Sequence, residues 1–154
     1  MDYSAKAKEI ISMIRYATIA TVSPDAQPWN SPVMIAYDEH YNFFWTSWSG
    51  TQHSQNICQN ANIFLVLYDS TALPGESEAV YVKAKAVELI DVDEITRAAL
   101  HLYERKNKPP RTAEEFVGES LRRMYKAVPE QVWISLDADV KSNFINTRRE
   151  ITLL

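Results

Sequence analysis

Short runs of β-branched and aromatic residues recur along this chain, and turn signatures of only a few residues separate them. The first turns are Ser23-Pro24-Asp25-Ala26 and Asp38-Glu39-His40-Tyr41-Asn42. Runs of this length and composition, one of them strictly alternating between apolar and polar residues, predict β-strands. The predicted strands are residues 16–22, 29–37, 43–48, 63–68, 79–90, 131–136 and 143–154.

Helical spacing of apolar residues is confined to a few segments between these strands. The predicted helices are residues 4–15, 52–59, 93–106 and 112 to about 125. The last opens on a capping box, Thr112-Ala113-Glu114-Glu115, and would carry Arg122, Arg123 and Lys126 in its last turn, where cations are favourable. Many short, mostly antiparallel strands with three or four helices predict a single α+β domain over residues 1–154, built as a barrel or a sandwich.

Two of the predicted strands carry further information. Pro32 cannot donate a ladder hydrogen bond, so the strand that contains it should be an edge strand or be interrupted by a bulge. The run at 63–68 is continuously apolar, which predicts a strand that is buried on both faces.

Charge and cysteine content exclude several classes of protein. The chain has 20 acidic and 16 basic residues, a formal net charge of -4, which argues against nucleic-acid binding. The single cysteine, Cys58, excludes an internal disulfide and is expected to be a reduced, partly buried thiol. His40 and His101 lack partners at metal-ligand spacing. No apolar run approaches the roughly 20 residues that span a bilayer, and no signal-peptide layout is present. We therefore expect a cytoplasmic protein without a metal, membrane or nucleic-acid partner.

The stretch from Phe43 to Ile57 is the candidate for a binding site. An apolar strand stops at Ser49-Gly50 and a helix begins, so unpaired N–H groups and the positive end of the helix dipole face an anion. Hydroxyl, amide and imidazole groups crowd this turn in Thr51, Gln52, His53 and Asn56. These features predict a phosphate site. The alternative is an N-cap at Thr51 followed by a solvated first turn.

Aromatic residues beside the turn suggest that a phosphorylated ligand would carry a flat ring. Trp45 and Trp48 lie three residues apart on a strand and therefore face opposite sides, so one of them should belong to the core or to a dimer contact. Thr46 and Ser47 could bond to a heteroaromatic ring. The chain shows no arrangement typical of a catalytic nucleophile, and a cofactor would supply the chemistry of any enzyme built this way.

The order of these elements resembles that of the pyridoxamine 5'-phosphate oxidase-like, FMN-binding split-barrel family. The resemblance rests on the helix, the strand at 16–22, its Ser-Pro-Asp turn, the strand segment 27–33, the strand at 43–48, and the turn and helix that end at Asn56-Ile57. It implies a mostly antiparallel split β-barrel with flanking helices and a homodimer with FMN between the subunits. Contacts from the partner chain could come from Tyr68, Lys83 or Arg148.

The resemblance also implies a role for each residue of the candidate site. The flavin ring would lie against the strand residues Asn30, Ser31, Pro32 and Val33, and the ring and ribityl chain against Trp45, Thr46 and Ser47. The FMN phosphate would be bound by Thr51, Gln52, His53 and Asn56.

Departures from the family pattern narrow the expected activity. Gln52-His53 stands where many members have Arg-Lys, so the compensation of the phosphate charge should be weaker and partly pH-dependent. Asn146-Thr147-Arg148-Arg149 lacks the histidine of the oxidase's substrate motif, which argues against synthesis of pyridoxal phosphate. We expect an FMN-dependent oxidoreductase that acts on an unidentified small molecule, its catalytic residues unknown. The alternatives are a non-catalytic split barrel that binds or senses a flavin, a deazaflavin or heme, and a structural dimer with an empty cleft.

Overall fold

The computed structural model describes residues 2–73, 78–140 and 143–154. The helices are α1 (Tyr3–Met13), α2 (Gln52–Gln59) and α3 (Val92–Arg105), with a 3-10 turn at Ala113–Phe116. The strands are β1 (Tyr16–Val22), β2 (Pro28–Met34), β3 (Ala36–Tyr37), β4 (Phe43–Trp48), β5 (Asn62–Tyr68), β6 (Ala79–Glu88), β7 (Arg122–Val140) and β8 (Asn143–Ile151).

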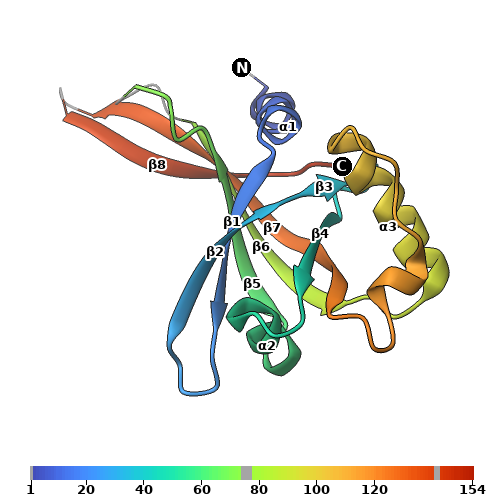
Figure 1. Ribbon diagram of the computed structural model, residues 1–154. Helices are drawn as coiled ribbons and strands as arrows, with labels where there is room; N and C mark the ends of the chain where they lie inside the picture. Colours follow the sequence, from blue (N-terminus) through green and yellow to red (C-terminus); the bar gives the residue numbers. More distant parts are fainter. Residues whose placement is uncertain (1, 74–77, 141–142) are drawn as a thin grey trace.

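The strands form one curled antiparallel sheet in the order β2-β1-β5-β6-β7-β4-β3, and β8 pairs with β7. Figure 1 shows the sheet bending round, with β2 at one end of the strand order and β4 next to β3 at the other. This is the split-barrel α+β fold that the sequence predicted. Pro28 and Pro32 lie in β2, which pairs only with β1 among the described strands, as expected of an edge strand.

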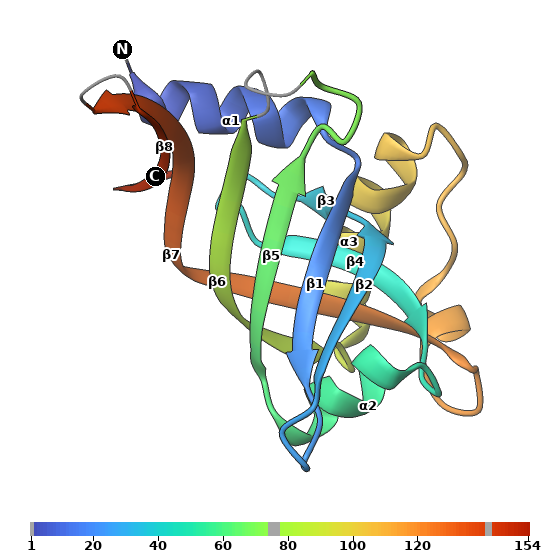
Figure 2. The ribbon, with the colours of Figure 1, turned by 90° about the vertical axis from the view of Figure 1, so that its left-hand side faces the viewer.

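Helices cover the two ends of the barrel and one part of its outside. In Figure 2, α1 lies across one end, α2 across the other, and α3 lies behind β4. The sheet face that is formed by β2, β1, β5 and β6 is turned to the viewer in Figure 2 and carries no described helix. No described helix is both long enough and apolar enough to cross a membrane.

Two hydrophobic cores share strands β4 and β7. Residues inside the barrel, Trp45 and Tyr125 among them, form the larger core with α1, β1, β5 and β6. Residues on the other face of the same two strands, Phe44 and Met124, pack with α3 and the 3-10 turn. Because both faces of β4 are covered at this level, its sequence is apolar without alternation.

Three sequence predictions are wrong. Residues 112 to 125 do not form a helix: only Ala113–Phe116 make a 3-10 turn, and β7 begins at Arg122. Met124 and Tyr125 must enter different cores, which adjacent residues do on a strand. Arg122, Arg123 and Lys126 therefore lie on β7 rather than in a helix turn.

The other two errors concern burial. In β5 only alternate residues are fully buried, Ile63, Leu65 and Leu67, because one face of this strand is left uncovered. Cys58 is exposed rather than partly buried, because α2 turns His53, Ser54, Asn56 and Ile57 toward the protein and leaves Cys58 on its outer side.

Candidate functional site

The β4–α2 turn is held by its own backbone and by one aromatic ring. Thr51 is the N-cap of α2, and its side chain accepts a hydrogen bond from the Ser54 N–H. The Trp48 carbonyl accepts from both the N–H and the hydroxyl of Thr51, at 3.1 and 3.0 Å. A Cβ at Gly50 would lie 2.7 Å from the Trp48 indole, so any larger residue here would displace the ring. The turn therefore presents the first N–H groups of α2, those of Gln52 and His53, in a fixed place.

His53 is the centre of a polar group that we call the hydroxyl–imidazole cluster: Ser31, Ser47, Thr51 and His53. The His53 Nε2 lies 2.7 Å from the Ser47 hydroxyl and 3.2 Å from the Thr51 hydroxyl, and the His53 Nδ1 lies 3.2 Å from the Ser31 hydroxyl. The side chain is only 7% exposed. The cluster brings together β2, β4 and α2. The resemblance placed Ser31 and Ser47 beside the flavin ring and ribityl chain, and Thr51 and His53 at the phosphate.

Burial determines the charge state of this cluster. Desolvation lowers the pKa of His53 below its ordinary value of 6.5, so the imidazole is neutral near pH 7. Each neighbouring hydroxyl can either donate or accept a hydrogen bond. The neutral ring and the imidazolium can therefore both be satisfied without rearrangement. The cluster offers hydrogen-bond donors to an anion and can add a positive charge only by taking up a proton.

Gln52 and Asn56 belong to a different part of the turn. The Gln52 amide donates to Asn56 Oδ1 at 2.8 Å, and the Asn56 amide donates to Thr21 Oγ1 at 3.0 Å. Asn56 is fully buried and ties α2 to β1. Both side chains line a cavity of about 260 Å³ that Asp25 also borders. The Ser23 hydroxyl lowers the pKa of Asp25, which keeps a negative charge there and makes this side of the turn unfavourable to a phosphate.

The predicted ring contacts are divided between the two faces of their strands. Trp45 is fully buried and stacks on Tyr125 with the ring centroids 5.6 Å apart, whereas Trp48 is 54% exposed. The prediction that one of the two tryptophans belongs to the core is confirmed. On β2, Val33 is buried, Ser31 points to His53, and Asn30 and Pro32 are exposed on the other face.

Thr46 points away from the hydroxyl–imidazole cluster. It borders a cavity of about 490 Å³ that Met34, Tyr16, Tyr103 and several cations also line. The sequence analysis placed Arg122 in the last turn of a helix, and so missed this cavity. The detectable signal was the strand-like sequence from Arg122 to Ala127, in which consecutive side chains alternate between two faces.

The proposed partner contacts lie on the uncovered sheet face. Tyr68 and Lys83 are exposed there. The Arg148 guanidinium lies 3.9 Å from the centroid of the Tyr81 ring, and that of Arg149 lies 4.7 Å from the Tyr3 ring on α1. The adjacent arginines thus reach different elements.

Comparisons with known proteins agree with this architecture. The family model described as pyridoxamine 5'-phosphate oxidase matches residues 3–133. A search of curated proteins finds no match. Three similar solved structures are the protein Atu2129 of unknown function from Agrobacterium tumefaciens, a candidate pyridoxamine 5'-phosphate oxidase from Listeria innocua, and HutZ, the heme storage protein from Vibrio cholerae.

Their similarity to this chain is one of fold. The TM-scores are 0.73, 0.64 and 0.71, and the sequence identities are 20%, 18% and 16%, in the same order. The alignments cover 87%, 86% and 86% of this chain. They cover 56%, 98% and 94% of the other chains, so this chain spans little more than half the length of the Agrobacterium protein.

Proposed function

This chain belongs to the pyridoxamine 5'-phosphate oxidase family, and we propose that it is a flavoprotein that binds FMN and acts as an oxidoreductase on a small molecule. The observation that carries the proposal is the convergence of Ser31, Ser47, Thr51 and His53 at the start of α2. Three separate elements supply these side chains. An N-cap followed by a solvated first turn, the alternative interpretation, would need only the Thr51 side chain.

The donors of this cluster fit a phosphate. The hydroxyl groups of Ser31 and Ser47 can donate to a phosphate oxygen, whereas the Thr51 hydroxyl already donates to the Trp48 carbonyl. The first turn of α2 adds the N–H groups of Gln52 and His53. His53 would add charge by protonation. Bound FMN would supply the hydride-transfer chemistry, and the protein would orient it and exclude water.

A homodimer would complete the site. The sheet face formed by β2, β1, β5 and β6 carries no described helix (Figure 2) and presents exposed apolar side chains, among them Tyr68 and Val22. A second copy of the chain would cover these apolar surfaces and bring Lys83 or Arg148 to the flavin of its partner. Light scattering coupled to size-exclusion chromatography should then give about twice the monomer mass.

The decisive experiment is the absorption spectrum of the purified protein, followed by identification of any flavin that is released on denaturation. We expect a yellow protein, FMN in the supernatant, and FMN binding at least tenfold tighter than riboflavin binding, because the phosphate adds charge-assisted hydrogen bonds. Ser47→Ala should weaken FMN binding several-fold and leave riboflavin binding unchanged, whereas the distant exposed control Ser12→Ala should change neither. A colourless protein that shows no thermal shift with added FMN would refute the proposal.

A non-catalytic heme protein is the second candidate, because one observation favours it. A cavity of about 500 Å³ is lined by His40, Tyr41 and the apolar side chains of Val132, Ile151 and Leu153. His40 is exposed and its imidazole could ligate iron, whereas both ring nitrogens of His53 are already occupied. Heme titration of the apoprotein should then give a Soret band that His40→Ala abolishes. A heme spectrum that is identical in His40→Ala and wild type would exclude this cavity.

A further inference from the structure

The cavity beside Thr46 is lined by five cations that come from separate parts of the chain. Arg15 precedes β1, Lys106, Lys108 and Arg111 follow α3, and Arg122 begins β7. None of the described residues that line the cavity is acidic. The chain as a whole has more acidic than basic residues, so an arbitrary patch of its surface would contain carboxylates. The positive charge in this cavity is therefore a local property that the overall composition does not explain.

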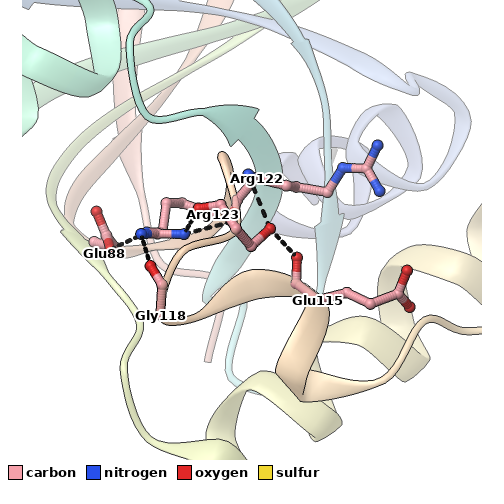
Figure 3. A network of polar contacts seen from close by, with 6 residues as sticks. Glu88, Glu115, Gly118, Arg122 and Arg123 are labelled. Carbon is pink, nitrogen blue, oxygen red and sulfur yellow. Dashed lines mark hydrogen bonds and ion pairs between the residues drawn. The ribbon is translucent and has the colours of Figure 1, made fainter.

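Most of these cations have no counter-ion among the residues that the structure describes. Arg111 forms an ion pair with Glu115. For Arg15, Lys106, Lys108 and Arg122, the described residues provide no ion-pair partner. Figure 3 shows the Arg122 side chain extending away from Glu88, which is bound by Arg123 instead. Arg123, on one face of β7, is thus paired with a carboxylate, whereas its neighbour Arg122, on the other face, has no carboxylate partner among the described residues.

The cations also act on one another. Lys106 lies with its ammonium 4.7 Å from the centroid of the Tyr103 ring. Burial lowers the pKa of Lys106, and the positive charges of Arg122, Lys108 and Arg111 lower it further. Like charges that are held together without a counter-ion raise the free energy of the folded state. A bound anion would reverse this contribution, which is the arrangement typical of an anion site.

We propose that this cavity binds an organic ligand that carries a pyrophosphate, such as a nucleoside diphosphate. Four cations without a carboxylate partner exceed what a single phosphate requires. The cavity, at about 490 Å³, is also far larger than one hydrated ion, since a water molecule occupies only about 30 Å³. Tyr16, which is 61% exposed, offers the ligand an aromatic face at the edge of the cavity.

The position of the cavity gives such a ligand a role. Thr46 and Met34 line it from β4 and β2, the strands against which the resemblance places the flavin ring. A pyrophosphate ligand held here would be the second substrate of the proposed flavoprotein. That role rests on the proposed function, whereas binding of the pyrophosphate itself does not.

Calorimetric titration of the full chain with inorganic pyrophosphate, ADP, orthophosphate and adenosine tests the proposal, in the absence and presence of FMN. We expect pyrophosphate and ADP to bind at least tenfold more tightly than orthophosphate or adenosine, with an affinity that falls as salt is added. Arg122→Gln and Lys108→Gln should each weaken pyrophosphate about tenfold or more, the loss that removal of one charged hydrogen-bond donor produces. Arg97→Gln, an exposed cation on α3 outside the cavity, should leave it unchanged.

Three results would overturn the proposal. The first is pyrophosphate binding that is no tighter than orthophosphate binding. The second is an equal affinity for pyrophosphate in wild type and in both cavity variants. The third is displacement of FMN by pyrophosphate, which would assign the cavity to the flavin phosphate. Failure of the proposed function is distinguishable: an apoprotein that binds no FMN but binds pyrophosphate in an Arg122-dependent way would support the cavity and refute the flavoprotein.

Discussion

Replacing Arg123 by glutamine should destabilise the fold substantially, whereas the same change at the adjacent Arg122 should not. The Arg123 Nε lies 2.9 Å from a carboxylate oxygen of Glu88, and its terminal nitrogens donate to the carbonyls of Gly118 at 2.7 Å, of Arg122 at 3.0 Å, and of Ser120. Figure 3 shows this guanidinium joining the end of β6 to the loop that enters β7. Gly118, whose carbonyl accepts one of these bonds, turns in this loop with φ of +60°.

The magnitude follows from the number of bonds and their exposure. Hydrogen bonds to charged groups contribute about 1.5–3 kcal/mol each. The side chains of Arg123 and Glu88 are 17% and 29% exposed, and one of the carbonyls belongs to the neighbouring residue, so the contributions are discounted. We expect a net loss of about 2–4 kcal/mol, which lowers the Tm by roughly 4–16 °C in a domain of this size.

Urea unfolding and calorimetry of Arg123→Gln, Arg122→Gln and Glu88→Gln provide the measurement. Glu88→Gln should lose a smaller amount than Arg123→Gln, since the carbonyl contacts of Arg123 remain. Arg122→Gln should stay within about 0.5 kcal/mol of wild type, because it removes a cation that repels its neighbours. Equal destabilisation of the two arginine variants, or an Arg123→Gln protein as stable as wild type, would contradict this prediction.

Three further predictions concern the histidine and a capping arginine. His53 has a folded-state pKa below its unfolded value of 6.5, so the stability that its neutral form contributes is present above pH 6.5 and is lost as pH falls from 6.5 through the folded-state pKa. In that window the free energy of unfolding should decline by up to about 1.4 kcal/mol per pH unit more in wild type than in His53→Gln. The second prediction concerns FMN affinity between pH 7 and 9, where the FMN phosphate is fully ionised. Because binding requires His53 to take up a proton, the affinity of wild type should fall by up to about tenfold per pH unit. A flat profile in wild type, matching that of His53→Gln, would contradict this. Arg105 donates to the carbonyls of Ile11, Ser12 and Ile14 at 2.9, 3.2 and 2.6 Å. Arg105→Ala should therefore lower the free energy of unfolding in urea by about 2 kcal/mol. The control Arg97→Ala, on the same helix, should stay within about 0.5 kcal/mol of wild type.

Local sequence patterns predicted those elements whose boundaries are set locally. β1, β4 and α2 occur at the predicted residues, because β-branched or aromatic runs end at strong turn signals and Thr51 caps the helix. The capping box at Thr112 was also read correctly, since the Glu115 carboxylate accepts from the Thr112 N–H at 3.1 Å. The length of the helical segment that follows was not predictable from the capping box alone. The chain leaves the 3-10 turn after Phe116 because the following residues pair with β4 and β6, far away in sequence.

The candidate site shows the same division. Ser47, Thr51 and His53 lie within seven residues of one another, and the strand–turn–helix pattern predicted Ser47 as a ring contact and Thr51 and His53 as phosphate contacts. Their direct contact with one another was not predicted. The cationic cavity depends on contacts between the start of β1, the segment after α3 and the start of β7. No short pattern connects these segments, so the sequence did not predict that their arginines and lysines line one cavity. Only the sheet order brings them together.

Alternation along β4 separates the two anion sites and gives them different physical signatures. Ser47 points to His53 and the next residue back, Thr46, points to the cationic cavity. The arginines of the cavity therefore do not neutralise a phosphate in the hydroxyl–imidazole cluster, whose affinity must come from hydrogen bonds and from the proton on His53. Binding there should depend on pH and little on salt, because the contacts are short and buried. Binding in the cavity should depend strongly on salt and little on pH near neutrality, since arginine stays charged and the cavity is open to ions. At low pH and high salt the protein should retain FMN and release a pyrophosphate ligand.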